Sequence, residues 1–375
     1  MSQDDFLQVP TVDISAFLGG TSADELAKEA AVRDLVAAVS TYGSFWVKLP
    51  VSEYSRRDRD NYLDSISHLF QVEPHNRVFH DGVGVARGYI KVGGESGASG
   101  NFEHKEGFSY GYSQWEQNGL EPSNDMEAHN VWPRDDHESP FSHQDRMTLE
   151  GKLFNLCTAV GDALVRMFSL DLCGSEHTLA DDWRGGETTH LARLFRYFPD
   201  SQLPESFSKE QYRQVLGSSP HTDWGLLTVI LADDTPGLEL LWTGKQVSAT
   251  KVGSEDDASE AGWKLVRPEF DQAKLFVNTG DFMSIVSGGR YISPLHRVVL
   301  PRAGSVASQE RNSCVFFYYP RYDANIPTLS NSCKQTYSVF TDQAKDGGGS
   351  LTVDDASMTF GSFISKKWAS VTRKP

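Results

Sequence analysis

Three side chains in two short segments of the chain have the chemistry of ligands for a single metal ion. Segment 219–225 contains His221 and Asp223, and segment 293–298 contains His296. Two neutral imidazoles and one carboxylate on one face of Fe(II) leave the other positions open for a co-substrate and O2. These residue types therefore predict a facial-triad iron(II) centre that activates oxygen.

The spacing of the three residues indicates which elements must position them. Residues i and i+2 of a strand point to the same side, so a His-x-Asp on a strand would aim His221 and Asp223 at one point. The apolar run 226–231 that follows is strand-like. We expect His296 to come from a distant strand that crosses nearby inside a sandwich or barrel.

Arg311 and Ser313 form a second candidate site at the head of a run of apolar and aromatic residues. The run 312–319 predicts a buried strand, on which the two side chains would share one side. A guanidinium binds a carboxylate through two parallel hydrogen bonds, and the hydroxyl adds another donor. Because an unpaired buried cation is costly, we expect the far carboxylate of a bound dicarboxylate here.

The chain contains a second His-x-Asp, formed by His143 and Asp145, and a different role is expected for it. The pair precedes apolar residues that recur at helical spacing up to Phe168. A helix is therefore predicted over about 144–168, with Asp145 as its N-cap. The motif alone is a weak signal, and only the match of His221 with the later segments makes it specific.

With these residues considered together, the chain resembles the isopenicillin N synthase-like family of iron(II)/2-oxoglutarate oxygenases. The resemblance covers about residues 9–322. Segment 193–199 looks most like that of the cephalosporin ring-expanding, deacetoxycephalosporin C synthase-like members. The other segments that carry the resemblance are 9–14, 42–47, 88–89, 103–108, 236–240, 277–281 and 291–293.

The resemblance implies roles for particular residues. His221, Asp223 and His296 would bind Fe(II), and Arg311 with Ser313 would bind 2-oxoglutarate. Many members have a tyrosine where this chain has Phe198, so Arg196 or Tyr197 would replace that contact with 2-oxoglutarate. Substrate contacts are expected from a region that in this family approaches the mouth of the site, and from the residue after the ligand pair: Arg87, Tyr89, Lys91, Lys105 and Trp224.

The implied reaction uses Fe(II), 2-oxoglutarate and O2 to oxidise a C–H bond of a small-molecule metabolite by hydroxylation, desaturation or oxidative cyclisation. If one of the cations near the mouth binds the substrate, the substrate carries a carboxylate. Two alternatives stay open at this point. One is an Fe(II)/O2 oxidase of the same fold that does not use 2-oxoglutarate. The other is a jelly-roll binding protein without catalysis.

The expected fold is mainly β with flanking helices, built around a double-stranded β-helix, or jelly roll, in one domain over 1–375. Residues 1–190 are expected to form a helical and irregular support region, 191–325 the jelly-roll core with the metal site, and 326–375 a C-terminal helix or lid. Within these regions, helices are predicted at 21–41, 54–70 and 360–371, an irregular glycine-rich stretch at 80–111, and a solvated acidic hairpin loop at 243–262.

The chain of 375 residues has a net charge of −16, so its surface should repel polyanions. Nucleic acids and anionic membranes are therefore not expected as partners. The four cysteines have no C-x-x-C spacing, which indicates a reducing compartment and no structural zinc. No signal peptide is apparent at the acidic start, so we expect a cytoplasmic protein that is a monomer or a weak oligomer.

Overall fold

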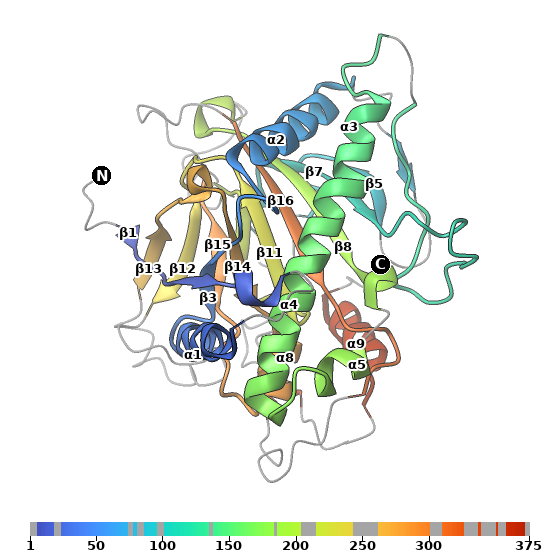
Figure 1. Cartoon of the computed structure of the whole chain (residues 1–375). Coiled ribbons are helices and arrows are strands. Elements are labelled where there is room, and N and C mark those ends of the chain that lie inside the picture. Colours follow the sequence, from blue (N-terminus) through green and yellow to red (C-terminus); the bar gives the residue numbers. More distant parts are fainter. Residues whose placement is uncertain are drawn as a thin grey trace.

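Two facing β-sheets form the centre of the molecule (Figure 1). The computed structural model describes residues 6–18, 24–73, 78–80, 86–95, 101–134, 138–183, 186–203, 215–242, 262–300, 310–325, 337–338, 350–351 and 358–371. The predicted acidic loop at 243–262 lies outside the described residues, apart from Gly262.

In the described part of the chain, the larger sheet has nine strands and the smaller has five. The order in the larger sheet is β2 (Thr11–Asp13), β3 (Ser44–Lys48), β14 (Lys274–Thr279), β11 (Leu227–Ala232), β16 (Arg311–Tyr318), β8 (Leu191–Tyr197), β7 (Lys105–Gly111), β5 (Arg87–Ile90) and β4 (Phe79–His80). The order in the smaller sheet is β1 (Phe6–Leu7), β13 (Gly262–Val266), β12 (Leu238–Trp242), β15 (His296–Val298) and β10 (Ser218–His221). Two short pairs complete the strands: β6 (Phe102–Glu103) with β9 (Val215–Leu216), and β17 (Tyr337–Ser338) with β18 (Ser350–Leu351).

Helices cover the outer face of the larger sheet (Figure 1). The helices in the described part of the chain are α1 (Glu25–Thr41), α2 (Arg56–Gln71), α3 (His143–Met147), α4 (Phe154–Cys173), α5 (Thr178–Trp183), α8 (Asp281–Val286) and α9 (Phe360–Val371), with short 3₁₀ turns at Ser15–Phe17, Gly186–Thr189, Asp200–Gln202 and Phe270–Gln272. The predicted helices at 21–41, 54–70 and 360–371 are therefore present; the first two start a few residues later than predicted, and the third has the predicted bounds.

Strand β8 shows how the sequence builds two hydrophobic layers from one sheet. Its residues Ala192 and Leu194 belong to the core between the sheet and the helices. Phe195 and Tyr197 belong to the core between the two sheets. Because alternate residues of a strand point to opposite faces, a strand buried on both faces is apolar almost throughout. The mainly β architecture with flanking helices agrees with the predicted jelly roll.

The prediction for residues 80–111 was wrong, because this segment contains strands of the larger sheet. All seven residues of β7 are buried, and β7 pairs along its length with β8. Glycines and charged residues hide this strand in the sequence. Its buried Lys105 pairs with Glu95 and with the nearby Glu103, and its buried Glu106 pairs with Arg196 of β8. Residues 1–190 therefore supply sheet strands as well as the helical support that was expected.

The central helix begins at the second His-x-Asp, as predicted, but Asp145 is not its N-cap. Ser142 is the N-cap, and Asp145 is the third residue of the helix. The two form a capping box, in which the Asp145 carboxylate accepts a hydrogen bond from the backbone N–H of Ser142. The helix then widens into a π-helical turn over Thr148–Leu153 before α4. This His-x-Asp therefore has a structural role, as expected.

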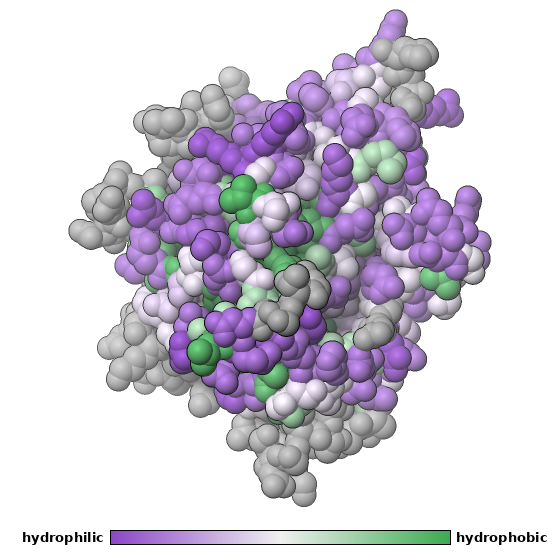
Figure 2. Space-filling model, viewed as in Figure 1, coloured by the Kyte–Doolittle hydropathy of each residue, from purple (hydrophilic) through white to green (hydrophobic). Residues whose placement is uncertain are grey.

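The helix over His143–Cys173 is long and apolar enough to cross a membrane, but 61% of its apolar window is buried inside the molecule. It packs against α1, α5 and strands β11 and β16. The face of the molecule that carries α4 is mostly hydrophilic, with apolar residues scattered among polar ones (Figure 2). These features are those of a core helix in a globular protein.

His190 predicts a dependence of stability on acid. Burial lowers the pKa of His190 to about 3, although its hydrogen bond to the Tyr319 carbonyl acts in the opposite direction. An unfolded histidine has a pKa of about 6.5, so between these values the unfolded state binds the extra proton. The free energy of unfolding should therefore fall as pH drops through this window, by at most about 1.4 kcal/mol per pH unit from this residue.

Urea denaturation at several pH values can isolate this contribution through a His190→Phe variant. Phenylalanine suits the site, because the rings of Phe154, Phe316 and Tyr318 surround His190. The variant should show a flatter dependence of stability on pH than the wild type. Equal slopes for the two proteins would contradict the assignment.

Candidate metal centre

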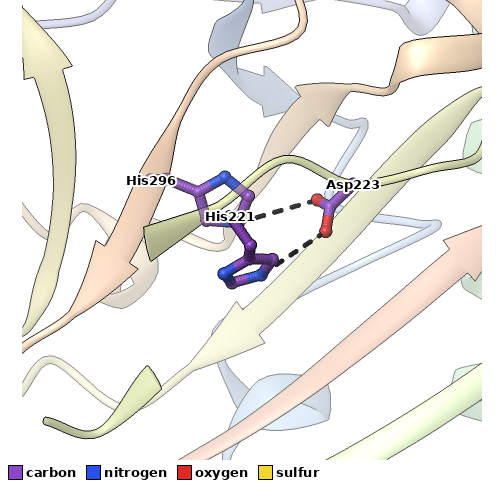
Figure 3. Close-up of side chains that lie close together, drawn as sticks. All are labelled: His221, Asp223 and His296. Carbon is purple, nitrogen blue, oxygen red and sulfur yellow. Dashed lines mark ion pairs between the residues drawn. The ribbon is translucent and has the colours of Figure 1, made fainter. Parts of the chain in front are cut away.

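His221, Asp223 and His296 converge at one end of the smaller sheet (Figure 3). His221 is the last residue of β10 and His296 the first of β15, and they are direct partners across the antiparallel pair. The Nε2 atoms of His221 and His296 each lie 3.8 Å from a different oxygen of Asp223. All three ligand atoms lie within 4.8 Å of one another. These separations exceed hydrogen-bond length and suit an ion held between the three groups.

The register of β10 on β15 contains an irregularity that determines where His221 points. Ser218 pairs with Val298, but His221 pairs with His296, so β10 uses one more residue than β15 over the same interval. Pro220 lies within this bulge on an edge strand, where a missing N–H is tolerated. The two imidazoles lie side by side across the pair, with ring centroids 4.3 Å apart and ring planes inclined by 51°.

Hydrogen bonds at the far side of each imidazole prepare it as a ligand. Nδ1 of His221 donates to the Ser219 carbonyl at 2.7 Å, and Nδ1 of His296 donates to the Pro294 carbonyl at 3.1 Å. A proton on Nδ1 leaves a lone pair on each Nε2, directed at Asp223. Burial and then the neighbouring His221 lower the pKa of His296 to about 4, which keeps it neutral. Oδ2 of Asp223 is buried and has no hydrogen-bond partner among the residues that the structure describes. The donor set therefore fits a divalent metal.

Asp223 does not lie on a strand, which corrects the sequence-based geometry. It lies in the turn between β10 and β11, and the N-terminus of α8 holds this turn in place. The Asp281 backbone N–H donates to the Asp223 carbonyl at 2.8 Å, and the Phe282 N–H donates to the carbonyl of Gly225 at 3.2 Å. The first backbone N–H groups of a helix have no acceptor within the helix, and in α8 the carbonyl groups of the turn supply these acceptors.

Arg311 and Ser313 lie on the face of β16 that looks toward the smaller sheet, together with Tyr197 from β8. Arg311 is buried and donates from Nε to the Thr235 carbonyl at 3.2 Å, and its guanidinium lies 5.0 Å from the centre of the Tyr197 ring. Among the described residues, no carboxylate forms an ion pair with Arg311, and the buried Ser313 hydroxyl has no partner. A buried guanidinium beside an unpaired hydroxyl suits an incoming carboxylate.

Arg196 lies on the opposite face of β8 from Tyr197. It forms an ion pair with Glu106 of β7 and lies over the Phe70 ring of α2, on the helical side of the sheet. The structure therefore brings Tyr197, and not Arg196, to Arg311. Phe198 follows the strand and packs against His104, with ring centroids 5.2 Å apart.

Among the candidate substrate residues, Arg87 has the most unusual surroundings. Its side chain is 1% exposed, yet its two hydrogen bonds go only to the backbone carbonyls of Ala86 and Met126. Its Nε is buried without a partner. Burial and the nearby Arg193 lower the pKa of Arg87 to about 10. Within the described part of the chain, this cation has no anionic partner.

The remaining candidates have ordinary partners. Lys105 is buried and binds Glu103 at 2.9 Å and Glu95 at 3.1 Å; although burial alone would lower its pKa, these carboxylates hold the pKa above the usual value. Tyr89 donates its hydroxyl to Glu106 at 2.6 Å. Lys91 is exposed. Trp224 is partly buried against the core and lies below the ammonium group of Lys367.

Several residues near the site gave no signal in the sequence. Glu95 bridges Lys105 and Arg193, and although burial alone would raise its pKa, these cations lower it to about 2. Tyr319 lies within electrostatic reach of Arg87, Arg193 and Asp223. Only Arg193 could have been found, because it is two residues from Phe195 and so shares the inner face of β8.

A cavity of about 540 Å³ lies on the helical side of the larger sheet, away from the three ligands. Its lining includes Tyr112, Phe154, Asp162, Trp183, His190 and Tyr318. None of the candidate metal, co-substrate or substrate residues lines this cavity. We therefore place the candidate site by its residues and not by the volume of a cavity.

Comparisons with known proteins agree with this architecture. Residues 189–320 match the model of the 2OG-Fe(II) oxygenase superfamily, and residues 9–135 match that of the N-terminal region of non-haem dioxygenases in morphine synthesis. Homoarginine-6-hydroxylase 2-ODD-C23.1 of Arabidopsis thaliana is 28% identical over 89% of this chain and 90% of its own length. A probable iron/ascorbate oxidoreductase of Dictyostelium discoideum is 24% identical over 84% of this chain and 82% of its own.

Among solved structures, a full-length protein of Neurospora crassa in complex with alpha-KG and 5-formyluracil superposes with a TM-score of 0.68. The two chains are 18% identical, and 98% of each is covered. At this identity the likeness shows a shared fold, which is the predicted jelly roll.

The chain belongs to the 2OG-Fe(II) oxygenase superfamily. It is a non-haem iron dioxygenase that uses Fe(II), 2-oxoglutarate and O2 to oxidise a small-molecule metabolite. Of the alternatives raised by the sequence, membership of an enzyme superfamily disfavours a non-catalytic binding protein. The 2-oxoglutarate-bound structures that share the fold, together with the ligand set, favour 2-oxoglutarate as co-substrate over a 2-oxoglutarate-independent oxidase. The resemblance to cephalosporin ring-expanding members stays a prediction.

Proposed function

We propose that His221, Asp223 and His296 hold the catalytic Fe(II) through the two Nε2 atoms and the Asp223 carboxylate. The observation that carries this proposal is the pair of Nδ1 hydrogen bonds, which leaves both Nε2 lone pairs facing one buried carboxylate. Two neutral imidazoles and one carboxylate leave a divalent iron with a net charge near +1 and open positions.

We further propose that Arg311 and Ser313 bind the far carboxylate of 2-oxoglutarate, with Tyr197 beside them. The support is the absence of any carboxylate partner for Arg311 in the described residues, together with the unpaired Ser313 hydroxyl. Tyr197 stacks near the guanidinium and limits its rotation, so the fork would be oriented before the co-substrate arrives.

We propose that the substrate carries a carboxylate, or an equivalent anion, which pairs with Arg87. An unpaired guanidinium that is almost completely buried is unfavourable unless an anion completes the site. Arg193 is already occupied by Glu95, whereas Arg87 has no carboxylate partner among the described residues. The homoarginine named for the Arabidopsis relative is an amino acid with a carboxylate, which supports a substrate of this class.

In this proposal the side chains of the protein bind and orient, and they do not transfer protons. The bound iron supplies O2 activation, coupled to oxidative decarboxylation of 2-oxoglutarate, for attack on a C–H bond. Arg311 and Ser313 fix one end of the co-substrate, and Arg87 fixes the anionic end of the substrate. Tyr319 is buried and lies within electrostatic reach of both Arg87 and Asp223. Its ring would separate the substrate anion at Arg87 from the three metal ligands and would exclude water from the space between them.

A panel of amino acids, their N-acylated derivatives and neutral analogues without the carboxylate would test the proposal. Succinate formation and O2 uptake with Fe(II) and 2-oxoglutarate should be stimulated by a carboxylate-bearing member and not by its amide or methyl ester. Equal stimulation by acid and ester would contradict an anionic substrate. No succinate above background in any reaction would instead question the co-substrate site.

Replacing Arg87 by methionine should weaken binding of the carboxylate-bearing substrate. Hydrogen bonds to charged groups contribute about 1.5–3 kcal/mol, so KM for that substrate should rise about 10- to 100-fold. KM for 2-oxoglutarate should stay unchanged. Lys91→Met is the matched control, because Lys91 lies just after the same strand but is exposed. Unchanged turnover and affinity in Arg87→Met would remove Arg87 from the substrate site.

We also propose that the enzyme works in the cytoplasm as a monomer or weak oligomer, without nucleic-acid or membrane partners. The support is the net charge of −16 and the free, mostly buried cysteines Cys157, Cys173 and Cys314. Analytical ultracentrifugation at micromolar concentration would test the oligomeric state, and a stable higher oligomer would contradict it.

A further inference from the structure

A buried ion pair connects the C-terminal helix to the region of the metal ligands. Nζ of Lys367 in α9 lies 2.7 Å from Oδ2 of Asp281, the first residue of α8. The two side chains are only 2% and 5% exposed. A buried carboxylate or ammonium group is costly alone, so each of the two requires the other.

Asp281 is bonded directly to the turn that carries the ligand Asp223. The Thr222 hydroxyl donates to the same Oδ2 atom of Asp281 at 3.2 Å. The backbone N–H of Asp281 donates to the Asp223 carbonyl at 2.8 Å. Lys367 therefore binds a carboxylate that holds the ligand turn by side chain and by backbone. The ammonium group also lies 5.9 Å from the centre of the Trp224 ring, on the residue after the ligand.

Aromatic packing places α9 firmly on this region. Phe360 and Phe363 contact the ring of Phe282, with centroids 5.2 and 5.5 Å apart. Phe360 also packs on Tyr319, at 5.3 Å, next to the proposed substrate anion site. The segment predicted as a C-terminal helix or lid therefore packs, as α9, against residues next to the ligand turn.

The charge of Asp281 matters because it is near the metal ligands. Asp281 lies within electrostatic reach of His296. Without Lys367, this carboxylate would be buried and uncompensated beside the three ligands. The Asp281 carboxylate would then be more stable if it moved toward solvent or toward a metal ion. Either movement would displace the turn that carries Asp223, because Asp281 is hydrogen-bonded to that turn.

We propose that Lys367 is a positioning residue for the iron centre, acting through Asp281, so that docking of α9 and binding of the metal are linked. The proposal rests on the assignment of His221, Asp223 and His296 as the metal ligands. Linkage is reciprocal: if α9 docking raises the affinity for Fe(II), then Fe(II) stabilises the docked helix by the same factor.

Titration of the metal-free full-length protein with Fe(II), under anaerobic conditions, tests the proposal without turnover. The dissociation constant should rise about 10- to 100-fold in Lys367→Met, the usual range for loss of an outer partner of a metal ligand. Lys366→Met is the matched control: the neighbouring Lys366 is exposed and contacts only the sulfur of Met358 in the described residues. It should bind Fe(II) as the wild type does.

The double variant Asp281→Asn/Lys367→Met separates positioning from general damage to the helix. It removes both charges and keeps an oxygen for Thr222, so it should recover most of the affinity lost in Lys367→Met. Additive losses in the double variant would overturn the proposed route through Asp281. If Lys367→Met does not fold, the comparison of Asp281→Asn with the double variant carries the same test, because Asp281→Asn alone leaves the Lys367 charge buried.

Amide hydrogen exchange of the α9 peptide gives a second readout. Saturating Fe(II) should slow exchange in α9 of the wild type, and the effect should be lost in Lys367→Met. Unchanged exchange on addition of Fe(II), with tight binding intact, would overturn the linkage while leaving the ligand assignment standing. If wild type and His296→Ala bind Fe(II) equally, the ligand assignment itself fails.

Discussion

Replacing His296 by alanine should abolish Fe(II) binding and turnover, with a loss of more than about 100-fold in affinity. Changes to groups behind metal ligands already cost about 10- to 100-fold, so removal of a ligand exceeds that range. The effect is large here because His296 is also the cross-strand partner of His221, and its ring is one wall of the site. Isothermal titration of the metal-free variant with Fe(II), followed by succinate assays, measures both losses.

The second His-x-Asp of the chain supplies an internal control. His143→Ala changes the same motif at an exposed helix start and should leave metal affinity unchanged. Both variants remove one imidazole, so a difference between their affinities for Fe(II) reports the position of the histidine and not the loss of a histidine as such. Wild-type affinity in His296→Ala would show that the three side chains do not form the iron site.

Replacing Arg311 by methionine should raise KM for 2-oxoglutarate about 10- to 100-fold, which corresponds to loss of hydrogen bonds to a charged group. Affinity for Fe(II) should remain within about twofold, since Arg311 touches none of the three ligands. Ser313→Ala should have a smaller effect, up to about tenfold, because a neutral hydroxyl contributes about 0.5–1.5 kcal/mol. Steady-state kinetics with 2-oxoglutarate as the varied substrate measures both.

Arg196→Met is the informative comparison for this prediction. Arg196 is likewise an arginine of the larger sheet, but it is only partly buried and pairs with Glu106 on the helical face. We expect Arg196→Met to lower the free energy of unfolding and to leave KM for 2-oxoglutarate unchanged. A rise in KM for Arg196→Met comparable with that for Arg311→Met would restore Arg196 as a co-substrate contact.

Local chemistry made the clustering of His221, Asp223 and His296, and the shared face of Arg311 and Ser313, predictable. A His-x-Asp before a strand, a distant histidine, and an Arg-x-Ser at the head of an apolar run are recognisable without coordinates, because each pairs residue type with strand periodicity. The choice between Arg196 and Tyr197 needed the orientation of β8. That orientation depends on which face packs against helices, and the apolar residues on both faces hide it in the sequence.

The features that were missed depend on contacts between distant segments. Strand β7 was invisible because Lys105 and Glu106 look like surface residues until Glu95 from an earlier segment and Arg196 from β8 pair with them. Asp281 and Lys367 are 86 residues apart in the chain, and neither belongs to a motif that indicates its partner. Tertiary pairing of buried charges overrides local preference at such positions, and only the folded arrangement reveals it.

The bulge in β10 has a consequence for how this enzyme can change over evolutionary time. Ser218 and His221 are three residues apart, but they oppose Val298 and His296, which are two residues apart and share a face. Removal of one residue between Ser218 and His221 would therefore leave a regular ladder in which His221 still opposes His296, whereas insertion of a further residue would shift the imidazole out of this register. Substitutions in this interval keep the count and preserve the direction of the imidazole. The pair of β10 and β15 is therefore constrained in how many residues it can gain more than in composition, and relatives that retain the chemistry should tolerate replacements there, or loss of the extra residue, but not insertions.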